Sequence, residues 1–308
     1  MRTISASRVP VHSGSHQSVL VFDIGGSHVA AAVCAGEGYR LGPVANAPHP
    51  KDASSEGFLD LLQTLGKKAM NGCGPVSGVE LAFPGPFEYN DGISRMEHKL
   101  PYLNGIDLRQ PLASRFGLQP SAVRFLNDAA AYLLGEIGAG AAQNVERAVG
   151  ITLGTGIGSA FAVHGHVVSS GPGVPPGGEI WNLPYEGGIL EDALSTRAIQ
   201  ADYQQRTGQL LQVSAIAALA TKDNHAAEVF AAFGHHLGQA LRSLLQDFAP
   251  QVVVLGGGIS RSAQLFLPQA QEELKSLDLK LCVTTLFDHA PLAGAGVAWF
   301  ATANGKAV

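Results

Sequence analysis

The chain has 308 residues, of which 46% are hydrophobic and 15% charged, and its formal net charge at pH 7 is −5. A disordered chain would be poorer in apolar residues and richer in charge, and a protein that neutralises nucleic-acid phosphates would be basic. No apolar run reaches the roughly 18 residues that a membrane span needs, so we expect a globular protein of about two domains that binds neither nucleic acid nor a membrane.

The three cysteines lie far apart at Cys34, Cys73 and Cys282, and no C-x-x-C pair occurs. This spacing predicts neither a disulfide framework nor a local zinc knuckle. Free cysteines are typical of a reducing compartment, and the first residues lack the apolar core of a secretion signal. We therefore expect a cytoplasmic protein.

Strands and helices alternate along the predicted chain, which favours an α/β fold. Residues 1–17 are polar and serine-rich, and we expect a flexible tail there. The following segment, SVLVFDIGGSHVAAAVC, predicts two strands joined by a glycine turn. Further strands are expected at 76–83, 122–126, 251–257 and 281–286, and helices at 55–70, 108–116, 129–142, 190–206, 213–220, 225–247 and from about 291.

A second strand–turn–strand unit, RAVGITLGTGIGSAFAVHG, begins at residue 147, about 130 residues after the first. One such unit in each half indicates an internal duplication, with chance similarity between glycine hairpins as the alternative. We assign an N-terminal lobe to residues 18–127, to which residues 292–308 return, and a C-terminal lobe to residues 128–291.

The first glycine turn follows an acidic residue at the end of a strand. In VFDIGGSH, Asp23 precedes Gly25, Gly26 and Ser27. Glycines let backbone N–H groups approach phosphate oxygens, and a neighbouring carboxylate holds Mg²⁺, usually through water. The alternative is a structural hairpin in which Asp23 is only a turn residue.

The second glycine turn, ITLGTGIGSA, offers Gly154, Thr155 and Gly156 to a phosphate. It is not a Walker A loop, because no lysine follows, and a strand rather than a helix is expected after it, which argues against a Rossmann fingerprint. The segment therefore predicts a phosphate-binding hairpin.

Two further segments lie where a strand meets a helix. Asn127 and Asp128 in FLNDAAAYLL are either a helix N-cap or a general base with an adjacent amide, and the two roles are compatible. The segment VVVLGGGISRS places three glycines, 256–258, after a buried strand, with Ser260 or Ser262 as the cap of the next helix.

Together, in this order, the four segments resemble the ROK family of sugar kinases (repressors, open reading frames, kinases), within the actin/hexokinase-like ATPase superfamily. D-I-G-G is similar to the family's first phosphate loop, with Ser27 in place of the usual threonine. L-G-T-G-I-G-S-A is similar to the second loop, L-N-D-A to the catalytic pair, L-G-G-G-I-S to the nucleotide-side turn and P-L-A-G-A-G-V-A-W to the closing helix. The resemblance spans residues 19–305 and implies two duplicated, ribonuclease H-like α/β lobes around an interlobe cleft.

The resemblance also implies an activity, the ATP-dependent phosphorylation of a hexose, with glucose favoured. Asp128 would be the general base that takes the proton of the attacking hydroxyl, and Asn127 would bind the sugar. Asp23 would lie near Mg²⁺, through water. The nucleotide would be held by Gly25, Gly26, Ser27, Gly154, Thr155 and Gly156, with Gly256, Gly257 and Gly258 beside the nucleoside.

The sugar side departs from the family's pattern. Family members carry an E-x-G-H segment that binds sugar and, with a cysteine run, a structural zinc. Here Glu179 matches the first glutamate, Trp181 and Asn182 stand where glycine and histidine are usual, and the cysteine run is absent. Glu191 is the candidate second carboxylate. Asn104, from the irregular stretch that follows residue 84, is a further candidate sugar contact.

Tetrahedral structural zinc needs its full ligand set, and here the histidine and all the cysteines are missing together. We therefore predict no zinc and a loop held by the packing of Trp181 and Pro184. The loss of the histidine leaves glucose, N-acetylmannosamine, N-acetylglucosamine and fructose open as substrates.

Three other functions are considered. A transcription repressor on this scaffold would need a DNA-binding domain ahead of the first phosphate loop, which the roughly 20 preceding residues disfavour. A catalytically weak sugar-binding protein and a polyphosphate-dependent kinase both stay open. A homodimer is implied by the family alone.

Overall fold

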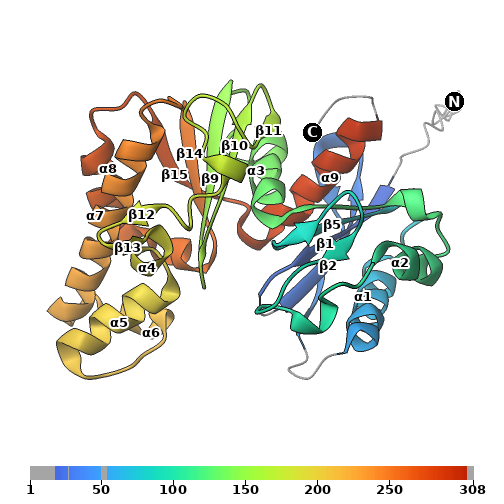
Figure 1. The fold of residues 1–308 in the computed structure, drawn as a ribbon, viewed down its shortest axis with the longest axis horizontal. Helices are drawn as coiled ribbons and strands as arrows, with labels where there is room; N and C mark the ends of the chain where they lie inside the picture. Colours follow the sequence, from blue (N-terminus) through green and yellow to red (C-terminus); the bar gives the residue numbers. More distant parts are fainter. Residues whose placement is uncertain (1–17, 27, 50–53, 304–308) are drawn as a thin grey trace, which may run out of the picture.

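The computed structural model describes residues 18–26, 28–49 and 54–303. The tail predicted at 1–17, the phosphate-loop candidate Ser27 and residues 304–308 lie outside the described residues. The described chain forms two α/β lobes side by side, each built around one mixed sheet (Figure 1). The predicted α/β class and two-lobed architecture are therefore confirmed.

The sheet of the N-terminal lobe has the strand order β3-β2-β1-β5-β8, and β4 also pairs with β2. The hairpin strands β1 and β2 are antiparallel, whereas β5 and β8 both run parallel to β1. The carboxyl ends of β1, β5 and β8 therefore meet at one edge of the sheet. The bounds are β1 (Ser18–Ile24), β2 (His28–Ala35), β3 (Arg40–Leu41), β4 (Ala45–Pro48), β5 (Val79–Phe83) and β8 (Val123–Asn127).

The sheet of the C-terminal lobe repeats this plan with the order β11-β10-β9-β14-β15. Again an antiparallel hairpin, β9 and β10, is followed by two strands parallel to its first member. This shared topology supports the predicted duplication. The bounds are β9 (Arg147–Leu153), β10 (Ile157–Val163), β11 (His166–Val168), β14 (Val252–Gly256) and β15 (Lys280–Val283).

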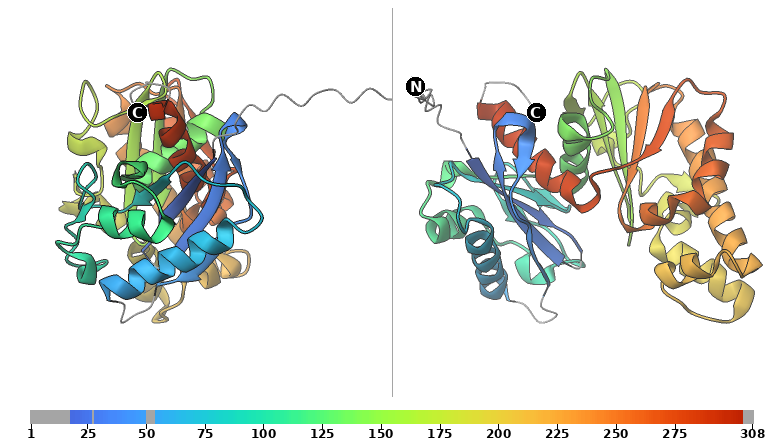
Figure 2. Two further views of the ribbon diagram at one scale, coloured as in Figure 1. Left: turned by 90° about the vertical axis from the view of Figure 1, so that its right-hand side faces the viewer. Right: turned by 180° about the vertical axis from the view of Figure 1, so that it is seen from behind.

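Helices cover both faces of the first sheet (Figures 1 and 2). On one face α1 (Ser55–Ala69) and α2 (Arg109–Phe116) bury leucines such as Leu62 and Leu112 against the strands. The N-cap of α1 is Ser54, whose hydroxyl accepts from the Gly57 N–H at 3.1 Å. On the other face lies α9 (Ala290–Ala303), the closing helix, whose Trp299 packs in one cluster with β1 and β2.

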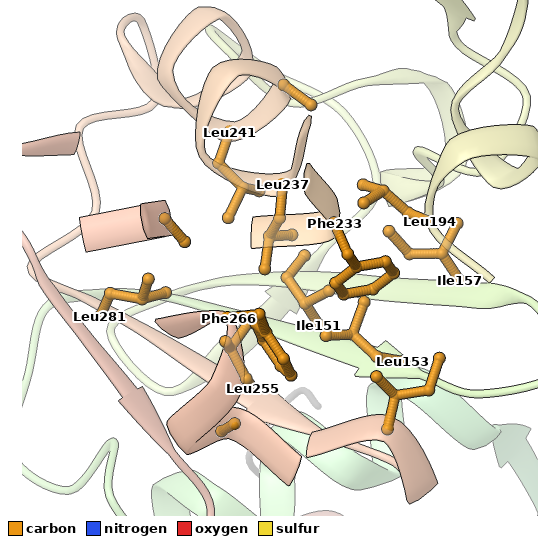
Figure 3. Close-up of a cluster of buried hydrophobic side chains, with 14 of the residues drawn as sticks. Ile151, Leu153, Ile157, Leu194, Phe233, Leu237, Leu241, Leu255, Phe266 and Leu281 are labelled. Carbon is orange, nitrogen blue, oxygen red and sulfur yellow. The ribbon is translucent and has the colours of Figure 1, made fainter. Parts of the chain in front are cut away.

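The second sheet is covered on one face by a helical layer that includes the 22-residue helix α7, and Figure 3 shows the core between them. Ile151, Leu153 and Leu255 from the strands meet Phe233 and Leu237 from α7, all nearly inaccessible to water. The remaining helices are α4 (Leu190–Ala193), α5 (Thr196–Thr207), α6 (Val213–Leu219), α7 (Asn224–Leu245) and α8 (Leu267–Leu274). Two small hairpins, β6 (Phe87–Glu88) with β7 (Ile93–Ser94) and β12 (Pro184–Tyr185) with β13 (Gly188–Ile189), complete the strands.

The two lobes are joined by the close crossing of α3 (Asp128–Ala139) and α9, which lies between the two sheets in both figures. A Cβ atom on Gly135 would lie 2.0 Å from the Ala290 carbonyl oxygen, and one on Gly294 would lie 1.7 Å from that of Ala131. Glycine is therefore needed at both positions for the helices to approach this closely. Asp128 is the first residue of α3, and α3 packs against α9 at this crossing. Asp128 therefore lies at the junction between the two lobes.

Most predicted elements are confirmed, but two details are wrong. The single helix expected at 190–206 is divided into α4 and α5, because Leu194 is buried and the Ser195 hydroxyl caps α5 by accepting from Ala198 N–H. The segment after β14 is a 3-10 helix, η5 (Gly258–Leu265), without a side-chain cap. Ser260 donates its hydroxyl to the Gly257 carbonyl at 2.6 Å instead of capping a helix.

None of the helices in the described part of the chain combines the length and the apolarity that crossing a lipid bilayer requires.

Candidate active site

Two of the predicted site residues end up at the same edge of the first sheet. Asp23 pairs in register with Ala82 of β5, and Ala82 pairs with Leu126 of β8, next to Asn127. Neighbouring strands lie about 4.8 Å apart. Two strand spacings therefore place the backbone of Asp23 about 10 Å from that of Leu126, just before Asn127 and Asp128. The parallel order of β1, β5 and β8 thus brings together motifs that are about 100 residues apart in sequence.

Asp23 has an unusual electrostatic environment. Its removal from bulk water, together with the nearby carboxyls of Asp128 and Asp288, raises the pKa of Asp23 to about 7. Asp288, in the turn before α9, also pairs with Arg261 at 2.8 Å. Carboxylate oxygens are the hard ligands that Mg²⁺ prefers. Asp23 therefore fits the predicted role of holding the ion through water, whereas the described residues contain no cluster of three such side chains that would bind it directly.

Asn127 and Asp128 form the junction of β8 with α3, as predicted. Asn127 is the N-cap, and its side-chain oxygen accepts from the N–H groups of Ala129 and Ala130, both at 3.0 Å. Its amide nitrogen donates to the Tyr89 hydroxyl at 3.1 Å. The oxygen of the Asn127 side chain thus caps α3, and its nitrogen bonds Tyr89. Both bonds hold the start of α3, where Asp128 lies, in a fixed position.

The Asp128 carboxyl is half-buried and accepts from the Ala129 N–H at 2.9 Å. Burial raises the pKa of Asp128, and Glu179 adds to this, whereas Lys99 and the Ala129 N–H oppose the rise. Lys99 of the N-terminal lobe and Glu179 of the C-terminal lobe are therefore near enough to Asp128 for their charges to influence it. Asp128 therefore lies where groups from both lobes converge.

The first glycine turn is held by backbone and imidazole contacts. The Gly25 N–H donates to the His28 carbonyl at 2.9 Å, and the Gly25 carbonyl accepts from Nε2 of His49 at 2.8 Å. Burial lowers the pKa of His49, which keeps this imidazole neutral. A Cβ on Gly26 would meet no protein atom within 4 Å, so the backbone there is open to a ligand.

The second glycine turn is held by the start of α5. The Gly154 carbonyl accepts from both the N–H and the hydroxyl of Thr196, at 2.8 and 2.9 Å, and the Gly154 N–H donates to the Gly156 carbonyl at 2.9 Å. Thr155 at the tip is exposed. This arrangement uses both polar groups of the Gly154 backbone to fix the loop, and it leaves Thr155 exposed.

Glu191 contacts this same loop. Its carboxylate accepts from the Ile157 N–H at 3.2 Å, and a Cβ on Gly156 would lie 2.2 Å from Glu191 Oε2. Glu191 was predicted as a sugar contact, and the structure shows it supporting the phosphate-loop candidate. A side chain at position 156 would therefore displace this carboxylate from its bond to the Ile157 N–H.

The three glycines after β14 differ from one another. Cβ atoms on Gly256 and Gly257 would collide with the Tyr132 ring at 2.4 Å and with the Leu153 carbonyl at 2.3 Å. Gly257 also has a φ of 80°, which disfavours any side chain. At Gly258 nothing lies within 4 Å. Gly257 and Gly258 are both exposed, but only Gly258 of the three would accept a Cβ without a close contact.

The sugar-side candidates lie on loops around Asp128. Glu179 accepts from the Trp181 indole N–H at 2.9 Å and influences the pKa of Asp128. Asn182 and Asn104 are both exposed. Among Glu179, Asn182 and Asn104, only Glu179 is found to influence the pKa of Asp128.

The prediction that Trp181 and Pro184 hold this loop by packing is wrong. Trp181 is 41% exposed and Pro184 is exposed as well. The loop is anchored instead by Ile180 and Leu190, which are buried in the core of the C-terminal lobe. Within residues 18–26, 28–49 and 54–303, no group of three or more His, Cys, Asp or Glu side chains is arranged to hold a metal ion.

Sequence reasoning missed several residues at the site. Tyr89 and Lys99 come from the irregular stretch between β5 and α2, where no periodic pattern distinguishes one polar residue from another. Thr196 lies in the S-T-R-A-I segment, which was matched only as a helix. Asp288 precedes the closing helix and could have been found as an acidic residue beside the P-L-A-G-A-G motif.

The duplicated sheets, the crossing helices and the paired glycine turns define an actin/hexokinase-like ATPase fold. The model of the ROK family matches residues 19–302, and the chain belongs to this family. Its relatives place it with the family's phosphotransferases that act on a sugar hydroxyl.

Two curated relatives and one solved structure illustrate the similarity. The glucokinase of Thermotoga maritima is 24% identical over 275 residues, which cover 82% of this chain and 85% of that enzyme. The N-acetyl-D-glucosamine kinase of Shigella boydii is 28% identical over 258 residues, covering 78% and 83%. A ROK glucokinase from Streptomyces griseus, solved with glucose and AMPPNP, superposes with a TM-score of 0.77 at 22% identity and covers 91% of this chain and 98% of that chain.

Proposed function

We propose that the protein transfers the γ-phosphoryl group of ATP to a hydroxyl of a hexose, with glucose as the favoured acceptor and Asp128 as the general base. The observation that carries the proposal is the convergence at Asp128. This carboxyl lies at the start of α3, where its charge raises the pKa of Asp23 in the N-terminal lobe and where Glu179 of the C-terminal lobe raises its own pKa.

Asp128 has the properties that a general base requires. Phosphoryl transfer needs mainly positioning and electrostatic stabilisation, and a positioned base contributes about 10²- to 10⁴-fold in rate. Burial raises the pKa of Asp128 and so increases its basicity, while Lys99 opposes the rise and favours the ionised form. A sugar hydroxyl within hydrogen-bond reach would lose its proton to this carboxylate as the phosphorus–oxygen bond forms.

The donor side would use the exposed parts of the glycine turns. Cβ atoms on Gly26 and Gly258 would meet no described protein atom within 4 Å, and Thr155 at the tip of the second turn is exposed. Asp23 would hold Mg²⁺ through water, and a bound Mg²⁺ supplies neutralisation of the phosphate charge.

The acceptor side would be formed by Asn127, Glu179 and Asn182, with Asn104 and Glu191 as further candidates. The curated relatives phosphorylate glucose and N-acetyl-D-glucosamine, as their names state. Asn182 offers a neutral donor and acceptor. N-acetylglucosamine, N-acetylmannosamine and fructose are therefore the alternative acceptors to be compared with glucose.

An assay of ADP release tests the proposal directly. The protein is mixed with MgATP and each of glucose, N-acetylglucosamine, N-acetylmannosamine and fructose, and polyphosphate replaces ATP in a parallel series. We expect turnover with MgATP and at least one hexose, with glucose the best. Sugar binding without turnover for any donor would instead indicate a catalytically weak sugar-binding protein.

The family resemblance also suggests a homodimer, and we include this state in the proposal. Sedimentation equilibrium at micromolar concentration would give twice the 31.9 kDa chain mass. A single-chain mass would overturn this part of the proposal alone.

A further inference from the structure

A cavity lies beside β8 and the helix crossing that joins the lobes. Its volume is about 500 Å³. Residues of the N-terminal lobe form most of it, Ala130 and Leu134 of α3 and Thr302 of α9 form the hinge side, and Val167 and Ser169 close it from the C-terminal lobe. Asn127 and Tyr89 line one end, so the cavity adjoins the candidate acceptor site without containing Asp128.

Two arginines give this cavity a positive character. Arg124 of β8 stacks on the Trp299 ring with its guanidinium carbon 4.2 Å from the ring centroid, and its nitrogen Nη1 is buried without an acceptor among the described residues. Arg109 of α2 donates from Nη2 to the Tyr89 carbonyl at 3.3 Å, and its Nε is likewise buried without an acceptor.

The carboxyl that could neutralise these arginines does not pair with them. Glu80 lies opposite Arg124 in register and is 4% exposed, yet none of the ion pairs found within 4.0 Å among the described residues involves it. Burial raises the pKa of Glu80 to about 8, against the opposing effect of Arg124. At pH 7 this carboxyl is therefore mostly protonated and can itself donate a hydrogen bond.

The unpartnered nitrogens of Arg124 and Arg109 lower the stability of the folded protein unless they are given an acceptor, because buried donors without an acceptor are destabilising. The two arginines line one cavity and give it an excess of positive charge. Guanidinium groups match the planar, bidentate geometry of carboxylates and phosphates.

We propose that this cavity is a binding site for a small metabolite that carries a carboxylate or phosphate group, held by Arg124 and Arg109. The cavity contains neither Asp128 nor any of the nucleotide candidates, and it shares Asn127 with the candidate acceptor site. Because its walls come from both lobes, a bound anion contacts the N-terminal lobe and Ser169 of the C-terminal lobe at once.

Titration calorimetry with two probes, inorganic phosphate and citrate, tests the site. The binding of MgAMPPNP is measured first. MgAMPPNP is then kept at saturation, so that inorganic phosphate cannot bind at the glycine turns. We expect at least one probe to bind, and Arg124→Gln and Arg109→Gln each to weaken its affinity about 10- to 100-fold, since each removes a charged hydrogen bond. Binding of phosphate alone assigns a phosphate ester, and binding of citrate alone assigns a carboxylate.

Two variants keep the test decisive. Arg115→Gln removes an arginine that pairs with Glu56 and Asp60 outside the cavity, and it should bind the probes as the wild type does. Ser169→Trp fills the exposed mouth of the cavity without touching its buried charges, so it abolishes binding even where Arg124→Gln fails to fold. No binding of either probe to the wild type at millimolar concentration, or wild-type affinity in the Ser169→Trp variant, overturns the proposal.

Discussion

The side-chain amide of Asn127 donates to the phenolic oxygen of Tyr89 at 3.1 Å, and the same hydroxyl donates to the Phe83 carbonyl at 3.1 Å. This bridge joins the carboxyl ends of β5 and β8 through a residue of the β6–β7 hairpin. Since the other side of the Asn127 amide caps α3, Tyr89 fixes the orientation of a side chain that we assign to the acceptor sugar.

Tyr89→Phe should therefore weaken acceptor binding more than it slows turnover. The change leaves the Asn127 amide and the Phe83 carbonyl without their partner, which costs about 1–3 kcal/mol. We expect KM for the hexose to rise about 5- to 100-fold and kcat to change by less. Steady-state kinetics over a range of hexose concentrations measures both.

The matched control is Tyr102→Phe. The Tyr102 hydroxyl is buried and has no hydrogen-bond partner in the part of the chain that the structure describes, so its removal should leave both constants near the wild-type values. Equal effects of the two substitutions would mean that the Tyr89 bridge has no specific role.

Substitutions at Gly257 and Gly258 distinguish an effect on the packing of the fold from an effect on nucleotide binding. Gly257→Ala places a Cβ against the Leu153 backbone at a φ of 80°, and we expect a loss of about 2 kcal/mol or more in the free energy of unfolding. Gly258→Ala meets no protein atom and should fold as the wild type does, yet weaken AMPPNP binding about tenfold. Chemical denaturation and calorimetry on both variants decide this. Unchanged AMPPNP affinity in Gly258→Ala would remove this turn from the nucleotide site.

Glu80 predicts a pH dependence of stability. Its pKa rises from an ordinary value of 4.5 to about 8 on burial. A buried acid with a raised pKa contributes full stability below its unfolded pKa, and this contribution is lost as the pH rises through the folded pKa. Relative to Glu80→Gln, the wild type should therefore lose a few kcal/mol of unfolding free energy between about pH 5 and about pH 8.5.

Urea denaturation of both proteins across that range measures the difference. The glutamine variant lacks the titrating group and should have the flatter profile. Profiles that run parallel from acid to alkaline pH would show that Glu80 does not change its protonation with folding in this way.

The absence of the family's zinc ligands predicts a protein that needs no zinc. Elemental analysis of the purified protein should give far less than one zinc per chain, and dialysis against a chelator should leave its melting temperature unchanged. A stoichiometric zinc that survives purification would contradict the prediction.

Much of the fold could be predicted because its signals are local. The apolar runs around Gly25 and Gly154 specify the two hairpins, and the N-cap at Asn127 marks the start of α3. The break at Leu194–Ser195 was missed because burial of Leu194 in the core, a tertiary effect, overrides the helical pattern of the surrounding segment.

The site was predictable where a residue belongs to such a motif, and not elsewhere. Asp23 lies near the end of β1 and Asp128 follows β8, and the parallel topology then brings them together. Tyr89 and Lys99 come from an irregular loop whose path depends on packing. Trp181 was expected to pack within its loop, but its indole N–H bonds the exposed carboxylate of Glu179.

The central claim is that Asp128 takes the proton of the attacking hydroxyl, and Asp128→Asn tests it most directly. The asparagine keeps the shape and can still accept from the Ala129 N–H, so glucose affinity measured by calorimetry should stay within a few-fold of the wild type. ADP release with MgATP and saturating glucose should fall by about 10² or more, whereas Asp91→Asn, on the exposed β6–β7 turn, should leave it unchanged. If Asp128→Asn turns over glucose at the wild-type rate, Asp128 is not the base and the proposed mechanism is wrong.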